Sequence, residues 1–362
     1  MARIWNKFIP LDKKLSNKVS LRGRRKVFVA MSGGVDSSVA ALMLKRKGYD
    51  VTGAHMICWE GCENNQDKQD AMRVAAKLEI PFIVFDFRKE YRHKVYDYMI
   101  NEYAAGRTPN PDVVCNSEIK FGIFLKRVLE MGADYIATGH YVRGVGDKLR
   151  IAKDLNKDQS YFLWKLTPEQ ISRSLFPIGE YFKREVRQIA KDAGLITAEK
   201  KDSQGLCFVG KLDFQEFLRE VLPKREGAVV NSKGEVLGQH DGAQFFTLGQ
   251  RHGLKLGGNL RPLYVAEKNL ETNTILAAEG SDDPVLYKKE IEVGDLNLVS
   301  DLPEKVLVRI RYRQPLQKAH VHKLSTKIYK LFFDLPERGV ASGQSAVFYE
   351  GENLLGGGII KA

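Results

Sequence analysis

The amino-acid sequence predicts an α/β fold: a doubly wound parallel sheet, followed by a small central domain and a C-terminal β-barrel. From Lys26 to about Gly210, apolar strand segments alternate with helical segments, which is typical of parallel βαβ units. Beyond Lys211 the strands are short and separated by Gly and Pro. From about Val285 they recur with turns at the spacing of a small barrel. The predicted parts are residues 1–25, 26–211, 212–284 and 285–362.

The first α/β part contains four predicted strands, and polar motifs follow three of them. The strands are residues 27–30, 49–57, 81–85 and 135–138, and the helices are residues 37–47, 67–78, 88–104 and 118–131. Ligands of doubly wound sheets bind beyond the carboxyl ends of the strands. We therefore expect one crevice to be lined by the loop at Ser32, by His55 and Met56, and by Gly139 and His140.

The first strand leads into a glycine-rich turn, residues 32–38, with the sequence SGGVDSS. Gly33 and Gly34 allow a close approach that a side chain would block. Three serines supply hydroxyl groups, and the following helix presents free N–H groups and a partial positive charge. Because no Gly-Lys-Ser/Thr follows, this is not the Walker pattern. The turn predicts a phosphate or pyrophosphate cradle; the alternative is a tight turn with no ligand.

The bulk composition favours a polyanionic partner. The chain has 362 residues with 57 Lys and Arg against 45 Asp and Glu, a net charge of +12, which indicates nucleic acid first and a merely basic globular protein second. No apolar run approaches the roughly 18 residues of a membrane span, so no membrane partner is expected. Residues 1–26 hold nine basic residues and one acid, Asp12. We interpret this leader as an RNA-touching or disordered arm of a cytoplasmic protein, or alternatively as an organelle transit segment.

Cys115 is the first candidate reactive thiol. It follows Thr108-Pro109-Asn110-Pro111-Asp112, where the two prolines predict an extended segment ahead of a helix that begins near Ser117 or Glu118. A thiol near a helix N-terminus has a lowered pKa, and the thiolate is the reactive form. Asp112 lies three residues earlier and could relay a proton. The alternative is a buried structural cysteine.

Cys207 is the second candidate thiol. Lys200 and Lys201 precede it, and Gly205 and Gly210 predict a flexible loop around it. Two loop thiols beside a nucleotide site suggest sulfur chemistry, in which one carries a persulfide and the other resolves the bond that results; the alternative is two unrelated thiols. Cys58 and Cys62 have CxxxC spacing with no second pair, so we expect loop residues rather than structural zinc, with an iron–sulfur site as the alternative.

Two further segments mix donors with aromatic rings. Residues 156–162, NKDQSYF, suit the reading of an extruded base. In the run RIRYRQ, alternation along one predicted strand, residues 305–312, would place Arg309, Arg311 and Arg313 on one face. That face would form an RNA-binding strip or a charged barrel edge.

With these motifs in place, the chain closely resembles the tRNA-specific 2-thiouridylase family from about Lys26 to the C-terminus. The resemblance rests on eight motifs in order: SGGVDSS, GRTPNPDVVCN, ATGHY, KDQSYFL, DSQGLCFVG, FTLGQRHGL, RYRQ and GQSAVFY. SGGVDSS itself is similar to the pyrophosphate loop of ATP pyrophosphatases. The resemblance implies an ATP-pyrophosphatase domain, a central domain and a β-barrel that helps to hold tRNA. The basic leader departs from the common bacterial pattern.

The resemblance also implies a reaction. ATP and Mg²⁺ would bind at the loop, and the C2 oxygen of the wobble uridine would attack the α-phosphate. Cys207 would carry a persulfide received from a cysteine desulfurase or relay protein. Cys115 would be the other catalytic thiol, with a transient Cys115–Cys207 disulfide, and Asp112 the acid/base. The implied substrates are tRNAs for Lys, Glu and Gln, and the implied enzyme is a monomer with no metal held by protein ligands alone.

Motif matching assigns further residues to the substrates. The nucleotide would contact the positions Ala30, Met31, Ser32, Gly33, Gly34, Val35, Asp36, Ser37, Met56 and Gly139. The target base would be surrounded by Asn110, Pro111, Asp112, Lys157, Asp158 and Gln159. The rest of the tRNA would touch His140, Arg311, Tyr312 and Gln344.

Three other functions remain open at this point. A related adenylating ligase or amidotransferase domain would attack with nitrogen and need no paired thiols. A non-catalytic tRNA-binding protein would keep the fold without consuming ATP. An iron–sulfur-dependent thiolase would use Cys58 or Cys62.

Overall fold

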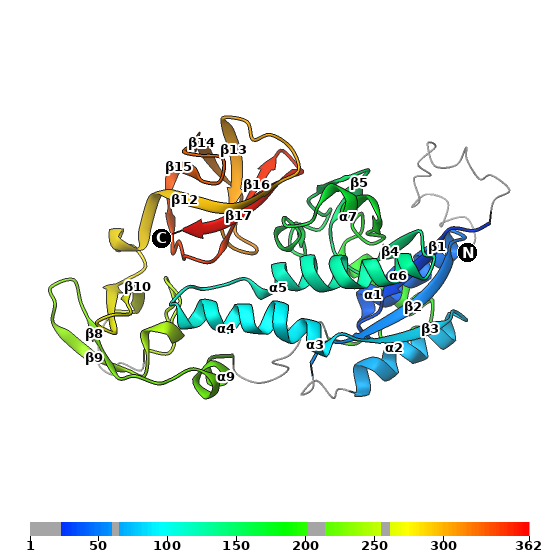
Figure 1. Cartoon of the computed structure of the whole chain (residues 1–362), viewed down its shortest axis with the longest axis horizontal. Coiled ribbons are helices and arrows are strands. Elements are labelled where there is room, and N and C mark those ends of the chain that lie inside the picture. Colours follow the sequence, from blue (N-terminus) through cyan, green and yellow to red (C-terminus); the bar gives the residue numbers. More distant parts are fainter. Residues whose placement is uncertain (1–22, 60–64, 202–213, 255–260, 362) are drawn as a thin grey trace.

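The computed structural model describes residues 23–59, 65–201, 214–254 and 261–361. Figure 1 shows an N-terminal α/β domain at one end of the molecule, with the central strands and the barrel at the other. Long helical segments between residues 88 and 130 run from the α/β domain toward the central strands. In the described part of the chain, no helix is both long and apolar enough to cross a membrane.

The N-terminal domain is built on a five-stranded sheet in the order β3-β2-β1-β4-β7, with all pairings parallel. Its strands are β1 (Lys26–Ala30), β2 (Asp50–Ile57), β3 (Phe82–Asp86), β4 (Tyr135–Ala137) and β7 (Ser174–Leu175). The order reverses between β1 and β4, which is the switch point where such sheets bind ligands. The predicted doubly wound sheet is therefore confirmed.

Helices cover both faces of this sheet because alternate residues of β1 point to opposite sides. Val27 and Val29 pack with the core under α1 (Val35–Arg46) and α8 (Lys183–Asp192), whereas Phe28 packs into the other core. The remaining helical segments are α2 (Asn65–Lys77), α3 (Arg88–Tyr91), η3 (Arg92–Tyr96), α4 (Asp97–Ala104), α5 (Pro111–Val114), η4 (Cys115–Phe124), α6 (Leu125–Glu130), η5 (Ser160–Phe162) and α7 (Pro168–Ser172).

The central domain is a four-stranded sheet in the order β10-β11-β8-β9. Its elements are α9 (Phe214–Val221), β8 (Gly227–Val230), β9 (Val236–His240), η6 (Ala243–Phe245), β10 (Leu263–Asn269) and β11 (Thr274–Glu279). Phe245 and Val265 join the same hydrophobic core as α4 and α5 of the N-terminal domain. The two domains are therefore packed together rather than linked loosely.

The C-terminal domain is a closed antiparallel barrel in the order β12-β15-β14-β13-β16-β17, and a β12–β17 pairing closes it. Its elements are η7 (Pro284–Leu286), β12 (Tyr287–Leu298), β13 (Lys305–Arg309), β14 (Gln317–Lys323), β15 (Tyr329–Arg338), β16 (Ser345–Glu350) and β17 (Asn353–Lys361). Inward residues such as Val293, Val308 and Phe348 fill its core. The predicted barrel is confirmed.

A hairpin of the N-terminal domain extends the barrel sheet. β5 (Arg143–Val145) and β6 (Lys148–Arg150) pair with each other, and β6 pairs with β17 through Arg150 and Asn353. The Ile151 amide also donates to the Glu352 carbonyl at 2.9 Å. The sequence analysis did not foresee this shared edge.

Candidate active site

The glycine-rich turn is pressed against the first turn of α2. Gly33 has a φ of +78°, and a Cβ added there would lie 2.1 Å from the Asp67 carbonyl oxygen. The Ser32 amide donates to the Ser37 hydroxyl at 3.2 Å, and the Ser38 hydroxyl donates to the Gly34 carbonyl at 2.7 Å. Only glycine fits the tight position, and the serines fold the turn over the start of α1.

The end of β4 abuts the same turn. A Cβ on Gly139 would lie 2.6 Å from the Ser37 amide nitrogen. Met31, at the end of β1, is buried, and its carbonyl accepts from His55 Nδ1 at 2.9 Å. Ala30 and Met56 are half-buried at the ends of β1 and β2, and Val35 is buried at the start of α1. The structure thus brings the predicted nucleotide residues together at the switch point of the sheet, where β1, β2 and β4 end.

Asp36 is held by two residues that the sequence analysis missed. Lys183 Nζ lies 2.8 Å from both of its carboxylate oxygens, and the Tyr141 hydroxyl donates to it at 2.8 Å. The Lys183 amide donates to Asp154 Oδ2 at 2.9 Å and fixes the start of α8. A lysine 147 positions away gives no signal in sequence spacing. The pair places a cation beside a cradle suited to phosphate.

A second ion-pair group lies on α2 beside the turn. Lys200 Nζ donates to Asp67 at 2.7 Å and to Asp70 at 2.6 Å. Burial lowers the pKa of the neighbouring His55. Lys200 is close in sequence to Cys207, which itself lies outside the described residues.

Cys115 lies in a helix and not in an extended loop, so the predicted helix start was wrong. The helix begins at Pro111 and continues through η4, a π-helical stretch. Proline is tolerated at the first helical position because its missing N–H would have no intrahelical partner. Cys115 is buried on the second turn. Gly122 permits the wide turn, since a Cβ there would lie 2.7 Å from the Ser117 carbonyl. Such π-helical segments frequently occur at functional sites.

Polar groups of this helix face the end of β4. Lys120 Nζ donates to Asn116 Oδ1 at 3.0 Å, and Asn116 Nδ2 donates to the Phe162 carbonyl at 3.2 Å. Burial raises the pKa of the Asp112 carboxyl, and the Lys120 charge opposes that rise. Burial, with Lys120 adding to it, lowers the pKa of His140 well below its ordinary value. The sequence analysis missed Lys120, although it is one π-helical turn beyond Cys115.

Residues 157–159 lie where the N-terminal domain meets the barrel. The buried Asp158 carboxylate accepts from Arg309 Nη1 at 2.8 Å, and also from the Ala152 amide and from the amide and hydroxyl of Ser160. Gln159 Oε1 accepts from the Tyr141 amide at 2.9 Å. Lys157 is half-buried in the adjoining turn. In this structure Asp158 therefore serves a domain contact.

The predicted arginine strip is wrong. β13 ends at Arg309, so Arg311 and Arg313 do not continue its alternation. Arg309 is buried against Asp158, while Arg313 is exposed at a φ of +64°. Arg311 Nη2 donates to the carbonyls of Leu248 and Gly339. Alternation predicts which residues share a face only while a strand continues. Here β13 ends at Arg309, and residues 311–316 form a turn and a loop.

Several of the other predicted tRNA residues also lie where the N-terminal domain meets the barrel, a boundary that we call the domain seam. The Tyr312 ring packs on Phe162 with centroids 4.5 Å apart. Gln344 Nε2 donates to the carbonyls of Thr108 and Pro109 at 3.0 and 3.2 Å. Asn110 and Pro111 are buried, and Asn110 hydrogen-bonds the buried Tyr161 side chain. The seam therefore reaches the start of the Cys115 helix.

Cys207, and with it the predicted Cys115–Cys207 disulfide, lies outside the described part of the chain. Cys62 also lies outside the described residues. Cys58 is half-buried just after β2. Within the described ranges, no group of three or more His, Cys, Asp or Glu side chains is placed to hold a metal ion.

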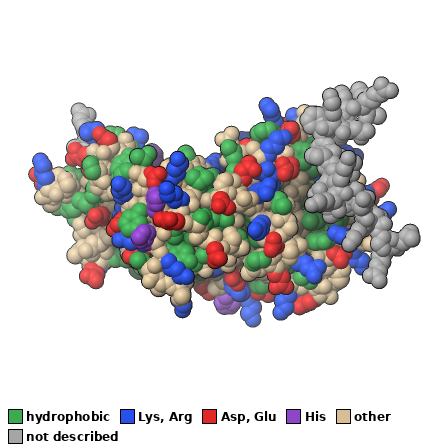
Figure 2. All heavy atoms as spheres, turned by 90° about the horizontal axis from the view of Figure 1, so that it is seen from above, with side chains coloured by type: hydrophobic (Ala, Val, Ile, Leu, Met, Phe, Trp, Pro, Cys, Tyr) green, Lys and Arg blue, Asp and Glu red, His purple; other side chains and the backbone are tan. Residues whose placement is uncertain are grey.

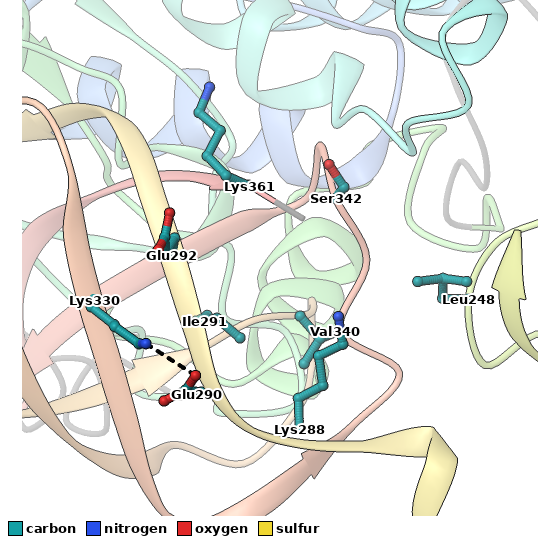
Figure 3. A pocket seen from close by; sticks show the side chains of 9 residues that line it. All are labelled: Leu248, Lys288, Glu290, Ile291, Glu292, Lys330, Val340, Ser342 and Lys361. Atoms are coloured by element: carbon teal, nitrogen blue, oxygen red, sulfur yellow. Dashed lines mark ion pairs between the residues drawn. The ribbon is translucent and has the colours of Figure 1, made fainter. Parts of the chain in front are cut away.

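The surface does not show a single basic patch on the face in Figure 2, where Lys and Arg alternate with Asp and Glu. A hollow of about 220 Å³ lies on the barrel side, lined by residues that include Lys288, Glu290, Lys330 and Lys361. Figure 3 shows Lys330 pointing to Glu290, with their charged atoms 3.0 Å apart. Its lining includes none of the residues of the glycine-rich turn.

Three family models match consecutive parts of the chain. They are described as a tRNA methyl transferase HUP domain (residues 25–211), a tRNA methyl transferase PRC-barrel domain (215–279) and an aminomethyltransferase beta-barrel domain (288–360). Part of the chain also aligns with a solved U34-tRNA thiolase from Methanococcus maripaludis at 18% identity, covering 56% of this chain and 65% of that one. The TM-score is 0.37.

Curated relatives match along almost the whole length. A tRNA-specific 2-thiouridylase of Geobacillus kaustophilus is 48% identical over 350 residues, covering 92% of this chain and 94% of the relative. That of Bacillus subtilis is 46% identical with the same coverage, and that of Chlamydia trachomatis is 44% identical, covering 93% and 98%. With the three domains and the cradle in order, the chain belongs to the tRNA-specific 2-thiouridylase family of sulfurtransferases.

Proposed function

We propose that this chain converts the wobble uridine of tRNA to 2-thiouridine, consuming ATP and a persulfide sulfur. The observation that carries the proposal is the 48% identity over 92% of the chain to a relative named for 2-thiouridylation. The glycine cradle and the helix with Asp112 and Cys115 support it, because adenylation and thiol chemistry need both parts.

The cradle residues fit a nucleotide phosphate. Gly33 and Gly139 allow backbone to approach where a Cβ would clash, and the start of α1 presents N–H groups. ATP is the substrate that supplies the adenylyl group. Mg²⁺ commonly binds through substrate phosphates and one or two carboxylates, and Asp36 is the carboxylate in the cradle. Lys183 would then exchange Asp36 for a phosphate oxygen.

The proposed reaction has three steps. The C2 oxygen of uracil attacks the α-phosphorus of ATP, and pyrophosphate leaves. The terminal sulfur of a persulfide on Cys207 attacks C2, and the C2–O bond breaks to release AMP. The Cys115 thiolate then attacks the Cys207 sulfur, which leaves sulfur on C2 and forms a disulfide. A thiol reductant restores both cysteines.

Asp112 is the proposed proton acceptor for this sequence. It lies one helical turn before Cys115, and its half-buried carboxyl has a raised pKa because of burial. A base whose pKa lies closer to neutrality transfers protons more effectively at physiological pH. The Lys120 charge lowers the pKa of Asp112 and so favours the carboxylate form.

The proposed partners follow from the same reaction. They are tRNAs for Lys, Glu and Gln, and a cysteine desulfurase or relay protein that loads Cys207. We propose a monomer that acts in the cytoplasm, with an organelle as the alternative location. The basic chain, at +12, matches a phosphate backbone.

A reconstitution tests the proposal: full-length protein, unmodified tRNA, ATP·Mg²⁺ and sulfide, with nucleosides analysed by mass spectrometry. We expect wobble 2-thiouridine together with AMP. AMP without thiouridine would point to a nitrogen-attacking ligase, and tRNA binding without AMP to a binding protein. Full activity of iron-free protein would exclude an iron–sulfur mechanism.

A further inference from the structure

The segment Thr108–Asn110 stands immediately before the helix that carries Asp112 and Cys115, and the barrel holds its backbone. The Thr108 amide donates to the Ser342 carbonyl at 2.8 Å. The side-chain nitrogen of Gln344, Nε2, donates to the carbonyls of Thr108 and Pro109, at 3.0 and 3.2 Å. One barrel loop thus bonds three consecutive backbone groups of this segment.

The central domain reaches the same segment. The hydroxyl groups of Thr108 and Thr247 lie 3.4 Å apart. Arg311 joins the central loop to the barrel, because its Nη2 donates to the Leu248 carbonyl at 2.9 Å and to the Gly339 carbonyl at 2.5 Å. All three domains therefore meet where the catalytic helix begins.

The carbonyl groups of this segment need hydrogen-bond donors from other parts of the chain, because the segment itself has few N–H groups. Pro109 and Pro111 lack N–H groups and hold the residues before them in extended conformations. Thr108 and Asn110 are each 7% exposed, so solvent does not readily replace a missing donor. The two hydrogens of one amide satisfy two successive carbonyls, and this places the segment relative to the barrel.

Close packing fixes the same position. Gly343 has a φ of +89°, and a Cβ added there would lie 3.0 Å from both the Arg107 Cβ and the Thr108 carbonyl oxygen. Arg107 is itself held by Glu102 through two bonds of 2.6 Å. A shift of the barrel loop would therefore press directly on the segment.

We propose that Gln344 is a positioning residue for Asp112 and Cys115. Because it donates to the Thr108 and Pro109 carbonyls, the position of the barrel fixes the position of the helix that carries these two residues. The inference rests on the proposed function and differs from a direct contact between Gln344 and tRNA. A positioning role affects the reaction of bound tRNA, whereas a contact role affects tRNA affinity.

The test compares Gln344→Glu with Gln317→Glu in the full-length protein. Both changes add one negative charge to the barrel, but only the first replaces the donor nitrogen with an acceptor; Gln317 lies on β14, outside the contacts described above. We expect Gln344→Glu to slow single-turnover thiolation at saturating tRNA about tenfold to a hundredfold relative to the control. The tRNA Kd should match the control, and amide exchange over residues 108–116 should be faster.

A second variant, Gly343→Ala, displaces the same segment without altering any polar side chain. It should show the same slow single turnover, unchanged tRNA Kd and faster exchange, and it decides the matter if Gln344→Glu does not fold. Weaker tRNA binding with an unchanged single-turnover rate in Gln344→Glu, or wild-type rates in both variants, would overturn the proposal. If the wild-type protein makes no 2-thiouridine, the proposed function fails, and the exchange rates alone decide whether the segment is held as described.

Discussion

Two ion pairs bind segments far apart in the chain, and they differ in burial. At the cradle, the Lys183 and Asp36 side chains are 13% and 29% exposed. At the domain seam, the Arg309 and Asp158 side chains are 8% and 0% exposed. A partly solvated pair can exchange partners at low cost, whereas a buried pair that loses one member leaves an uncompensated charge. The first pair suits a site that receives phosphates, and the second suits a permanent joint.

The largest expected effect comes from breaking the seam. Asp158→Ala leaves Arg309 buried without its carboxylate and should destabilise the protein by about 3–5 kcal/mol. The matched change at the cradle, Asp36→Ala, should cost about 1 kcal/mol because solvent screens that pair. Denaturant unfolding of both variants measures the difference. Equal losses would contradict the comparison, and adding Arg309→Met to Asp158→Ala should recover part of the stability.

The cradle should respond more strongly in activity than in stability. Lys183→Met removes the cation beside Asp36, and we expect AMP formation to fall about a hundredfold because the charge on the phosphates loses a fixed partner. Lys191→Met is the control, since Lys191 lies on the same helix and pairs with exposed Glu199. AMP release and melting temperature are measured together. Equal AMP rates in the two variants would show that Lys183 is only structural.

Lys120 offers a test through pH dependence. Burial raises the pKa of Asp112 and Lys120 lowers it, so removing the lysine should raise that pKa further. A base must be ionised, so the rate falls as pH drops through its pKa. The acid side of the pH–rate profile of Lys120→Met should therefore move to higher pH. If it moves by one pH unit, the rate at a given pH on that side falls about tenfold. Lys120→Arg should keep the wild-type profile; an unmoved acid side in Lys120→Met would remove Lys120 from this role.

The smallest expected effect concerns Lys268, a half-buried cation that donates to a carbonyl instead of a carboxylate. Lys268 Nζ bonds the Phe246 carbonyl at 2.6 Å, and burial lowers its pKa to about 8. The pKa of lysine in the unfolded chain is about 10.4. The destabilisation from burying the ammonium group is therefore at its full value below pH 8. Stability should rise as pH increases across that window, because the folded state loses this proton at lower pH than the unfolded state does. Lys268→Met should lack the rise, as followed by amide exchange in the central domain; a rise in the variant would assign it to another group.

Local sequence patterns predicted the sheet and the cradle because these depend on short-range features. Val27 and Val29 are buried, as their apolar side chains predict, and Gly33 lies where a Cβ would clash. The helix start at Pro111 was missed because proline at a first helical position and proline in an extended segment share the same sequence pattern. Arg309 was misplaced because strand alternation identifies a face but does not show what covers it. Lys183 was not predicted because it is 147 residues from Asp36 in the sequence and contacts it only in the folded structure.

The strand pairing between β6 and β17 has a consequence for how this protein can be divided. The boundary that separates the family models lies between residues 279 and 288, yet backbone hydrogen bonds cross from Ile151 to Glu352. A fragment that ends before the barrel would uncover the edge of β6 and the buried Asp158, and exposed strand edges promote aggregation. The barrel and the N-terminal domain therefore cover each other's sheet edges, and we expect neither to keep its structure unchanged when the chain is cut between them.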